Sequence, residues 1–85
     1  MRHRVRVLLF ATARQAAGRG ELEYEVPPEG ISVGALLARL TDDHPGLGRI
    51  VPHARLLRNG EYLRGGAGTL RPGDEFAVHP PYSGG

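Results

Sequence analysis

One amphipathic helix is the feature that most constrains how this chain can fold. Apolar residues recur at the i, i+3, i+4 and i+7 spacing of a single helix face, at Val33, Leu36, Leu37 and Leu40. Ser32, directly before them, is a good N-cap residue. We expect the helix to end near Asp42-Asp43-His44, because Pro45 disfavours helical geometry in the residue before it. The apolar face of this helix must pack against another surface, and most of the remaining sequence has the pattern of strands.

Two segments before this helix alternate between inward and outward positions, as half-buried strands do. In residues 4–10 one face holds Val5, Val7 and Leu9, and the other holds Arg4, Arg6, Leu8 and Phe10. Residues 21–26 alternate again and stop at Pro27-Pro28, which cannot donate hydrogen bonds to a ladder. Between these two strands, residues 11–17 are rich in helix formers and end at Gly18, which predicts a short helical turn with a glycine cap.

Three more short strands are predicted after the helix. Residues 55–58 and 62–64 flank Asn59-Gly60, the dipeptide that best tolerates the positive φ angles of a tight hairpin. Residues 71–74 form another turn signal, Arg-Pro-Gly-Asp. This turn leads into residues 75–79, where Phe76 and Val78 share one face.

The order of elements therefore predicts an α+β fold. Eighty-five residues suffice for one domain with a single core and are too few for two. A mixed sheet of about five strands, with the one main helix packed across its buried face, covers the pattern economically. We expect the domain to span residues 1–79 and an extended tail to span residues 80–85.

Composition argues against several classes of function. The chain has a formal net charge of +2, and its arginines are spread from Arg2 to Arg71 instead of forming a basic stripe, so we expect no nucleic-acid partner. It has no cysteine, and therefore no disulfide, thiolate nucleophile or cysteine-based metal site. The longest apolar run, residues 7–11, is far too short to span a bilayer, so we expect no membrane association and a cytoplasmic location.

Three further patterns favour ordinary structure over chemistry. The four histidines lack any metal-ligand spacing, which predicts no metal site; they are His3, His44, His53 and His79. Asp42-Asp43 resembles a carboxylate pair but lies at a predicted helix end, where solvated polar residues are usual. Residues 64–69 are rich in glycine, yet they lack the lysine that a phosphate-binding P-loop requires, so a hairpin connection is expected there.

The terminal segment is the strongest candidate for function. After His79 the chain continues as Pro80-Pro81-Tyr82-Ser83-Gly84-Gly85. Prolines stop ladder pairing and favour an extended conformation, and six residues at no more than about 3.6 Å each reach roughly 20 Å. Two glycines before a free carboxylate can pass through a narrow channel, since no Cβ meets the walls. The alternative is a frayed terminus without a role.

Taken together, these segments resemble a known family. The resemblance rests on residues 5–11, Ala13-Arg14-Gln15, the helix from Ser32, Asn59-Gly60, residues 70–75 and the ending Pro80-Pro81-Tyr82-Ser83-Gly84-Gly85. The chain is similar over nearly its whole length to the MoaD/ThiS family of ubiquitin-like sulfur carriers, and more closely to the MoaD-type small subunits of molybdopterin synthase. The resemblance implies a β-grasp fold. ThiS-type carriers are shorter and lack the double proline.

The resemblance also implies a reaction cycle. In the family, an E1-like (MoeB-type) partner adenylates the C-terminal glycine with ATP, and a sulfur donor converts it to a thiocarboxylate. The tail then enters the large (MoaE-type) subunit, in a heterotetramer, and gives sulfur to cyclic pyranopterin monophosphate in molybdenum cofactor biosynthesis. Here Gly85, preceded by Gly84, would carry the sulfur. The chain itself would bind no cofactor and act as a non-catalytic carrier whose active site lies mainly on the large subunit.

A docking surface is expected beside the tail. Leu8 and Phe10 lie on the strand face that the helix does not cover, and Tyr62, Ala77 and His79 continue a patch there if the strands pair as predicted. The predicted partner-binding residues are Leu8, Phe10, Tyr62, His79, Pro80, Pro81, Tyr82 and Ser83. A carrier must dock before its tail can act, whereas scattered surface hydrophobes would be an ordinary feature of any domain.

Three hypotheses remain open from the sequence. The first is a sulfur carrier for molybdopterin, and the second is a related carrier for thiamine or tRNA thiolation. The third is a β-grasp binding module with an inert tail. Intact mass after incubation with an activating enzyme, ATP and a sulfur donor separates the third from the other two.

Overall fold

The computed structural model describes residues 3–81, and residues 1–2 and 82–85 lie outside the described part. The order of the main elements is β1 (Arg4–Leu9), α1 (Ala11–Ala17), β2 (Glu21–Glu25), β3 (Ile31–Ser32), α2 (Val33–Asp43), β4 (Arg55–Arg58), β5 (Glu61–Tyr62), β6 (Thr69–Leu70) and β7 (Glu75–His79). Short 3₁₀ helices are η1 (Pro45–Arg49), η2 (Val51–His53) and η3 (Arg64–Gly66). The predicted α+β class is confirmed.

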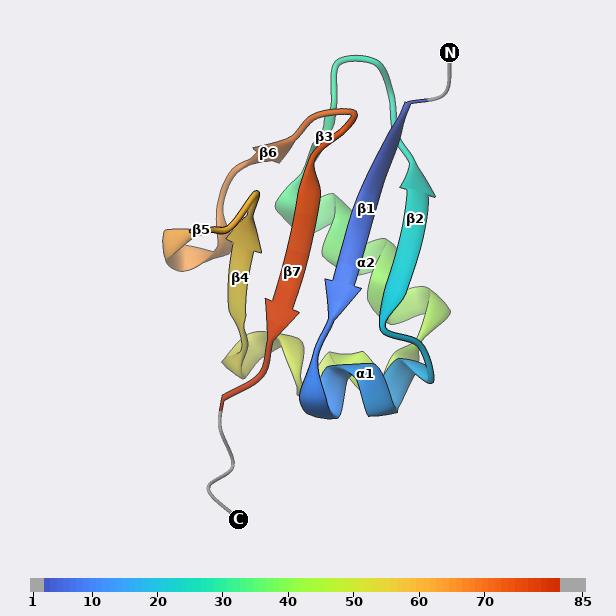
Figure 1. The fold of residues 1–85 in the computed structure, drawn as a ribbon, viewed down its shortest axis with the longest axis vertical. Helices are drawn as coiled ribbons and strands as arrows, with labels where there is room; N and C mark the ends of the chain where they lie inside the picture. Colours follow the sequence, from blue (N-terminus) through green and yellow to red (C-terminus); the bar gives the residue numbers. More distant parts are fainter. Residues whose placement is uncertain (1–2, 82–85) are drawn as a thin grey trace.

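Five strands form one mixed sheet in the order β2-β1-β7-β4-β5. The two central strands, β1 and β7, run parallel, and the other neighbours are antiparallel. Figure 1 shows α2 crossing one face of this sheet, with the other face left open toward the viewer. The first strand of the chain, β1, and the last, β7, are therefore neighbours. Because β7 is the middle strand, residues 80–81 continue from the middle of the sheet.

The core lies between this sheet and α2. Val5, Val7 and Leu9 of β1 are each at most 1% exposed, and Val7 is opposite Phe76 in the register of β1 with β7. The apolar stripe of α2 meets them through Val33, Leu36 and Leu40, which are fully buried. Side chains of this kind each stabilise the fold by about 1.5 to 3 kcal/mol when buried. The prediction that Val5, Val7 and Leu9 share the buried face of the first strand is therefore confirmed.

The ends of both helices follow from local sequence. The Ser32 hydroxyl accepts a hydrogen bond from the Ala35 amide at 3.1 Å, which satisfies one of the free N–H groups of the first turn of α2. The helix ends at Asp43, as predicted from Pro45. The α1 helix ends at Gly18, whose φ of 75° is the left-handed value that glycine adopts without steric cost.

A second, two-stranded sheet was not predicted. Ile31 pairs with Leu70, and Ser32 with Thr69. This pairing brings Gly30 so close to β6 that a Cβ built on it would lie 2.5 Å from the Leu70 carbonyl oxygen. Gly30 also has a φ of +99°, so glycine is required there on two grounds.

The predicted hairpin is present, but its second strand is shorter than expected. Asn59 and Gly60 have φ values of 50° and 83°, as a turn of this kind requires. The second strand covers Glu61–Tyr62 instead of residues 62–64, because Gly65 (φ 67°) turns the chain into η3. The first strand likewise ends at Leu9, one residue before Phe10.

Two loops are tied together beside the hairpin by one carboxylate. Asp74 accepts hydrogen bonds from the Arg71 amide at 2.8 Å and from the Asn59 side-chain amide at 3.1 Å. Burial raises the pKa of Asp74, but these two hydrogen bonds and the charges of Arg58 and Arg71 outweigh it, so the pKa lies below its ordinary value. The ionised form of Asp74 therefore supports the fold.

One predicted solvated residue also has a structural contact. Asp43, at the end of α2, accepts a hydrogen bond from the Tyr24 hydroxyl at 2.9 Å. Burial, the hydrogen bond to Asp43 and the charge of Asp43 raise the pKa of Tyr24 to about 12. This contact joins the edge strand β2 to the helix layer.

None of the helices within residues 3–81 has the length and apolar character needed to cross a membrane. The division into a domain of residues 1–79 and a tail of residues 80–85 stays a prediction, since most of the tail lies outside the described residues.

Candidate docking face and tail root

An apolar row crosses four strands on the sheet face that α2 leaves uncovered. Leu8 of β1 pairs with Ala77 of β7, Ala77 pairs with Leu57 of β4, and Leu57 pairs with Tyr62 of β5. Paired residues point to the same side of a sheet, so these four side chains form one row. Ala77 is only 8% exposed between its neighbours, whereas Tyr62 at the edge is 58% exposed. We call these four residues the apolar row.

Phe10 and His79 extend this surface toward the end of the sheet. Their rings are stacked, with centroids 4.2 Å apart and an interplanar angle of 15°. Phe10 keeps an extended backbone (φ −120°, ψ 155°), and its amide still donates to the Val78 carbonyl at 3.3 Å. Its own carbonyl accepts from the amides of Ala13 and Arg14, which begin α1. Phe10 thus ends the ladder and starts the helix, and its side chain remains 39% exposed.

A groove lies where the chain leaves β7. It is lined by His53, Arg55, Leu57, His79, Pro80 and Pro81. The pairing of Arg55 with His79 in the β4–β7 register places both side chains on the uncovered face. Pro80 is half-buried and Pro81 is exposed. We call this feature the tail-root groove, because residues 82–85 continue from it.

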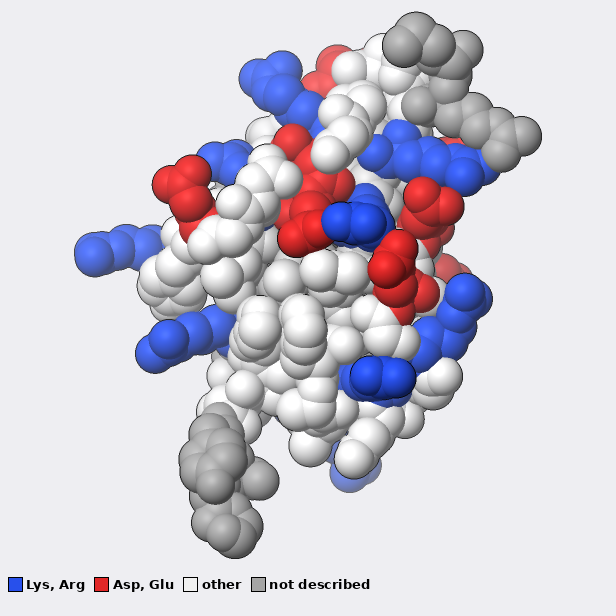
Figure 2. Space-filling model, viewed as in Figure 1, with Lys and Arg blue, Asp and Glu red and all other residues white. Residues whose placement is uncertain are grey.

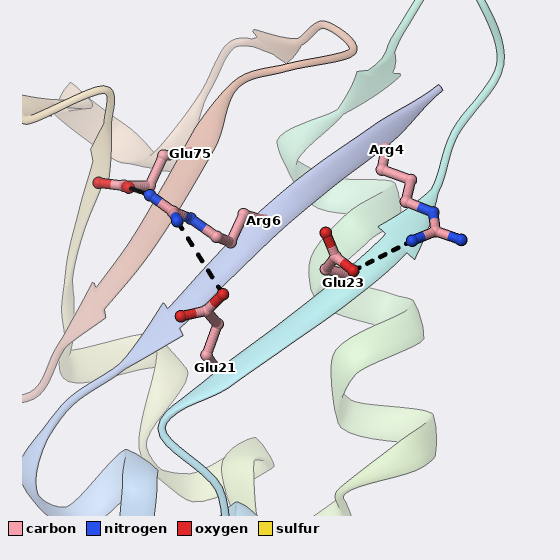
Figure 3. A network of polar contacts seen from close by, with 5 residues as sticks. All are labelled: Arg4, Arg6, Glu21, Glu23 and Glu75. Carbon is pink, nitrogen blue, oxygen red and sulfur yellow. Dashed lines mark hydrogen bonds and ion pairs between the residues drawn. The ribbon is translucent and has the colours of Figure 1, made fainter. Parts of the chain in front are cut away.

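The opposite end of the same face is occupied by ion pairs. Arg4 contacts Glu23 at 3.1 Å, and Arg6 contacts Glu21 at 4.0 Å and also Glu75 (Figure 3). The hydrogen bond to Glu75, followed by the charges of Glu75 and Glu21, raises the pKa of Arg6. All five side chains are exposed or half-buried, so each pair adds little stability. The outward residues of β7 thus change from charged Glu75 through Ala77 to aromatic His79.

The structure therefore brings together most of the predicted partner-binding residues. Leu8, Phe10, Tyr62, His79, Pro80 and Pro81 lie on one continuous surface. Tyr82, Ser83, Gly84 and Gly85 lie outside the described residues, and their roles stay predictions. Phe10 faces outward as predicted, although it belongs to the start of α1 and not to the strand.

Three residues of this surface were missed from the sequence: His53, Arg55 and Leu57. Leu57 was detectable in principle, because residues 55–58 place two adjacent leucines on opposite sheet faces. Leu56 is buried at 6% exposure, so Leu57 must point outward. His53 precedes β4 in η2, and no sequence pattern indicated that it would lie beside Pro80.

The described part of the site contains neither a cluster suited to a metal ion nor a cysteine. Residues 3–81 contain no cluster of three His, Cys, Asp or Glu side chains suited to a metal ion. The chain has no cysteine, so none of its side chains can serve as a thiolate nucleophile.

Comparisons with known proteins agree with this geometry. A model of the ThiS family matches residues 7–85. The molybdopterin synthase sulfur carrier subunit of Chlamydomonas reinhardtii is 37% identical over 82 residues, covering 95% of this chain and 98% of that protein. Small archaeal modifier protein 1 of Haloferax volcanii is 36% identical over 85 residues, covering 91% and 95%. The crystal structure of SAMP1 from Haloferax volcanii has a TM-score of 0.81 at 33% identity, covering 96% and 99%.

The mixed sheet with its crossing helix is the ubiquitin-like β-grasp fold, as expected from the sequence. The chain belongs to the ThiS family, within the MoaD/ThiS group of sulfur carriers that its sequence motifs resemble. That resemblance is confirmed.

Proposed function

We propose that this chain is the sulfur carrier subunit of a molybdopterin synthase, with Gly85 as the residue that carries the sulfur. The observation that carries the proposal is the extent of the family match, which runs from Val7 to Gly85 and so includes the Gly84-Gly85 pair. The relative from Chlamydomonas reinhardtii, whose name states this role, supports the choice of pathway.

The chemistry follows from the poor electrophilicity of a carboxylate. An oxygen of the Gly85 carboxylate attacks the α-phosphorus of ATP, and pyrophosphate leaves. Sulfide supplied by the donor then attacks the acyl carbon, AMP leaves, and a thiocarboxylate remains. The chain has neither lysine nor a P-loop, so a separate E1-like enzyme of the MoeB type must bind the ATP. No cysteine is present to hold a persulfide, so the sulfur goes directly to Gly85.

Delivery requires a partner that receives the tail. In the proposed cycle the apolar row and Phe10 dock on a large subunit of the MoaE type, and residues 82–85 enter its active site. There the thiocarboxylate gives its sulfur to cyclic pyranopterin monophosphate, toward the dithiolene of molybdopterin. Two carriers on a dimer of large subunits make the proposed heterotetramer, which works in the cytoplasm.

A second candidate is suggested by the Haloferax volcanii relative, whose name calls it a modifier protein. In that role an amine of another protein would attack the acyl carbon of the same adenylate, AMP would leave, and an amide bond would form. A carrier for thiamine or tRNA thiolation would use the same thiocarboxylate with a different acceptor.

Reconstitution separates these candidates. The chain is incubated with ATP, sulfide, the adenylating enzyme and the MoaE-type subunit of the same genome, and molybdopterin formed from cyclic pyranopterin monophosphate is measured. We expect product with the full chain and none after deletion of Gly85, a terminal residue whose loss should not affect folding. Sulfur transfer to a thiazole precursor or to tRNA, but not to the pterin, would favour the other carriers.

A further inference from the structure

The tail-root groove has a distinctive charge pattern. Its lining includes one arginine and two histidines and no acidic residue, with Arg55, His53 and His79 around Leu57 and the two prolines. The Arg55 guanidinium carbon lies 6.0 Å from the centre of the Tyr62 ring, so the base borders the apolar row.

The acidic residues of this face lie elsewhere. The three ion pairs found among residues 3–81 use Glu21, Glu23 and Glu75, and their bases are Arg4 and Arg6. Arg55 takes part in none of them. In Figure 2 the lower end of the face, where β7 ends, shows basic and uncharged atoms but no acidic ones. Within residues 3–81 the face is therefore polarised, with ion pairs at one end and Arg55, which forms none of them, beside Pro80 and Pro81.

Docking would remove water from this base. A protein pocket that receives residues 82–85 must bring its rim against Pro80 and Pro81, and these prolines form a wall of the tail-root groove. Arg55 lies in the same groove and would be covered by that rim. A buried guanidinium without a partner is strongly unfavourable, whereas a carboxylate can bind its planar fork through two parallel hydrogen bonds.

We propose that the tail-root groove receives a carboxylate-bearing rim of the protein that accepts the tail, with Arg55 as the main contact. This inference rests on the proposed function and names the chemistry of the partner surface. Leu57 and the prolines make the groove partly apolar, and it is continuous with the apolar row. Both features suit a protein surface better than a free phosphate or a nucleic acid, which needs an extended basic track.

The test compares two arginines that undergo the same change of charge. Binding of the chain to the MoaE-type subunit is measured by calorimetry for the wild type, Arg55→Glu and Arg49→Glu. Arg49 is exposed on η1 and does not line the groove, so it controls for net charge. We expect Arg55→Glu to weaken binding about tenfold or more, because it places like charges together. Arg49→Glu should stay within about twofold of the wild type.

Salt dependence provides a second readout. Affinity of the wild type should fall as ionic strength rises, and Arg55→Gln should show a smaller fall. Thermal unfolding of each variant confirms that it is folded before binding is compared. Equal affinities for Arg55→Glu, Arg49→Glu and the wild type would overturn the inference while leaving the carrier function intact.

Two further outcomes would also overturn it. If the wild type itself shows no binding to the MoaE-type subunit, the proposed function fails, and the inference fails with it. If Arg55→Glu instead abolishes self-association of the chain and leaves subunit binding unchanged, the groove receives the Glu21, Glu23 and Glu75 region of a second copy.

Discussion

The stacked rings of Phe10 and His79 join the two central strands of the sheet at the point where the tail begins. Phe10 follows β1 and His79 ends β7. The parallel pairing of these strands therefore brings the two rings to the same end of the sheet. Pro80 follows His79 directly. The stack and the root of the tail are therefore parts of one surface, since His79 also lines the tail-root groove.

Phe10→Asp should separate docking from folding. Phe10 is 39% exposed, so its replacement should cost only about 0.5 to 1.5 kcal/mol through loss of the ring stack. The complex with the MoaE-type subunit should be lost, because the new carboxylate would be desolvated without a partner. Calorimetric binding and thermal unfolding measure the two effects.

Leu9→Asp is the matched control for this position. Leu9 is 1% exposed, and a buried charge there should unfold the domain. A folded Leu9→Asp together with an unfolded Phe10→Asp would mean that the two faces of the first strand have been assigned the wrong way round.

Replacing Pro80 and Pro81 with glycine should weaken productive docking. Glycine gives the free tail more conformations, and this entropy is lost on binding, at a cost of a few tenths to about 1 kcal/mol per site. The stability of the domain should not change, since both residues follow the last strand. Unchanged or tighter binding of the double variant would contradict this account of the tail.

Gly30→Ala and Gly34→Ala should change stability in opposite directions. An alanine Cβ at position 30 would lie 2.5 Å from the Leu70 carbonyl oxygen at a φ of +99°, so we expect a loss of at least about 1 to 2 kcal/mol. Gly34 lies in α2, and a Cβ added there would meet no atom within 4 Å, so alanine should stabilise the helix by up to about 1 kcal/mol. Chemical denaturation measures both, and equal effects would contradict the close approach of β6.

Asp74 should make stability depend on acid pH. Its pKa is lowered in the folded chain, so its contribution is present above the ordinary value of 3.8 and is lost as pH falls through the lower folded value. Asp74→Asn should lower the free energy of unfolding by about 1 kcal/mol at neutral pH, since the group is partly screened by solvent. The variant should also lose less stability than the wild type as the pH falls. Asp42→Asn, at an exposed position, is the control and should have little effect. A wild-type acid profile identical to that of Asp74→Asn would exclude this role.

The sequence predicted the elements whose signals are local. The alternation of Val5, Val7 and Leu9 and the Ser32 cap depend only on neighbours in the chain, and both were correct. The strand Thr69–Leu70 was missed, because two residues carry no periodicity and their pairing with Ile31–Ser32 is a tertiary event. The position of Leu57 within the apolar row required the register of three strands.

The candidate site was predicted only in part, because some of its residues are brought together by tertiary pairing and not by local sequence. Outward positions such as Leu8 and Phe10 followed from the period of one strand, so they could be named from the sequence. The contact of Phe10 with His79 and the gathering of His53, Arg55 and Pro80 in one groove depend on which strands become neighbours. Charge clusters of this kind are not visible along the chain, because their members come from separate elements.

The central claim is that Gly85 is an activated sulfur carrier, and the intact mass of the chain tests it most directly. The chain is incubated with its adenylating enzyme, ATP and a sulfur donor, and its mass is measured before and after. We expect a gain equal to the replacement of one oxygen by one sulfur, located by fragmentation at Gly85 and absent from a chain that lacks Gly85. An unchanged mass in the full chain, or the same gain in the truncated one, would contradict the account.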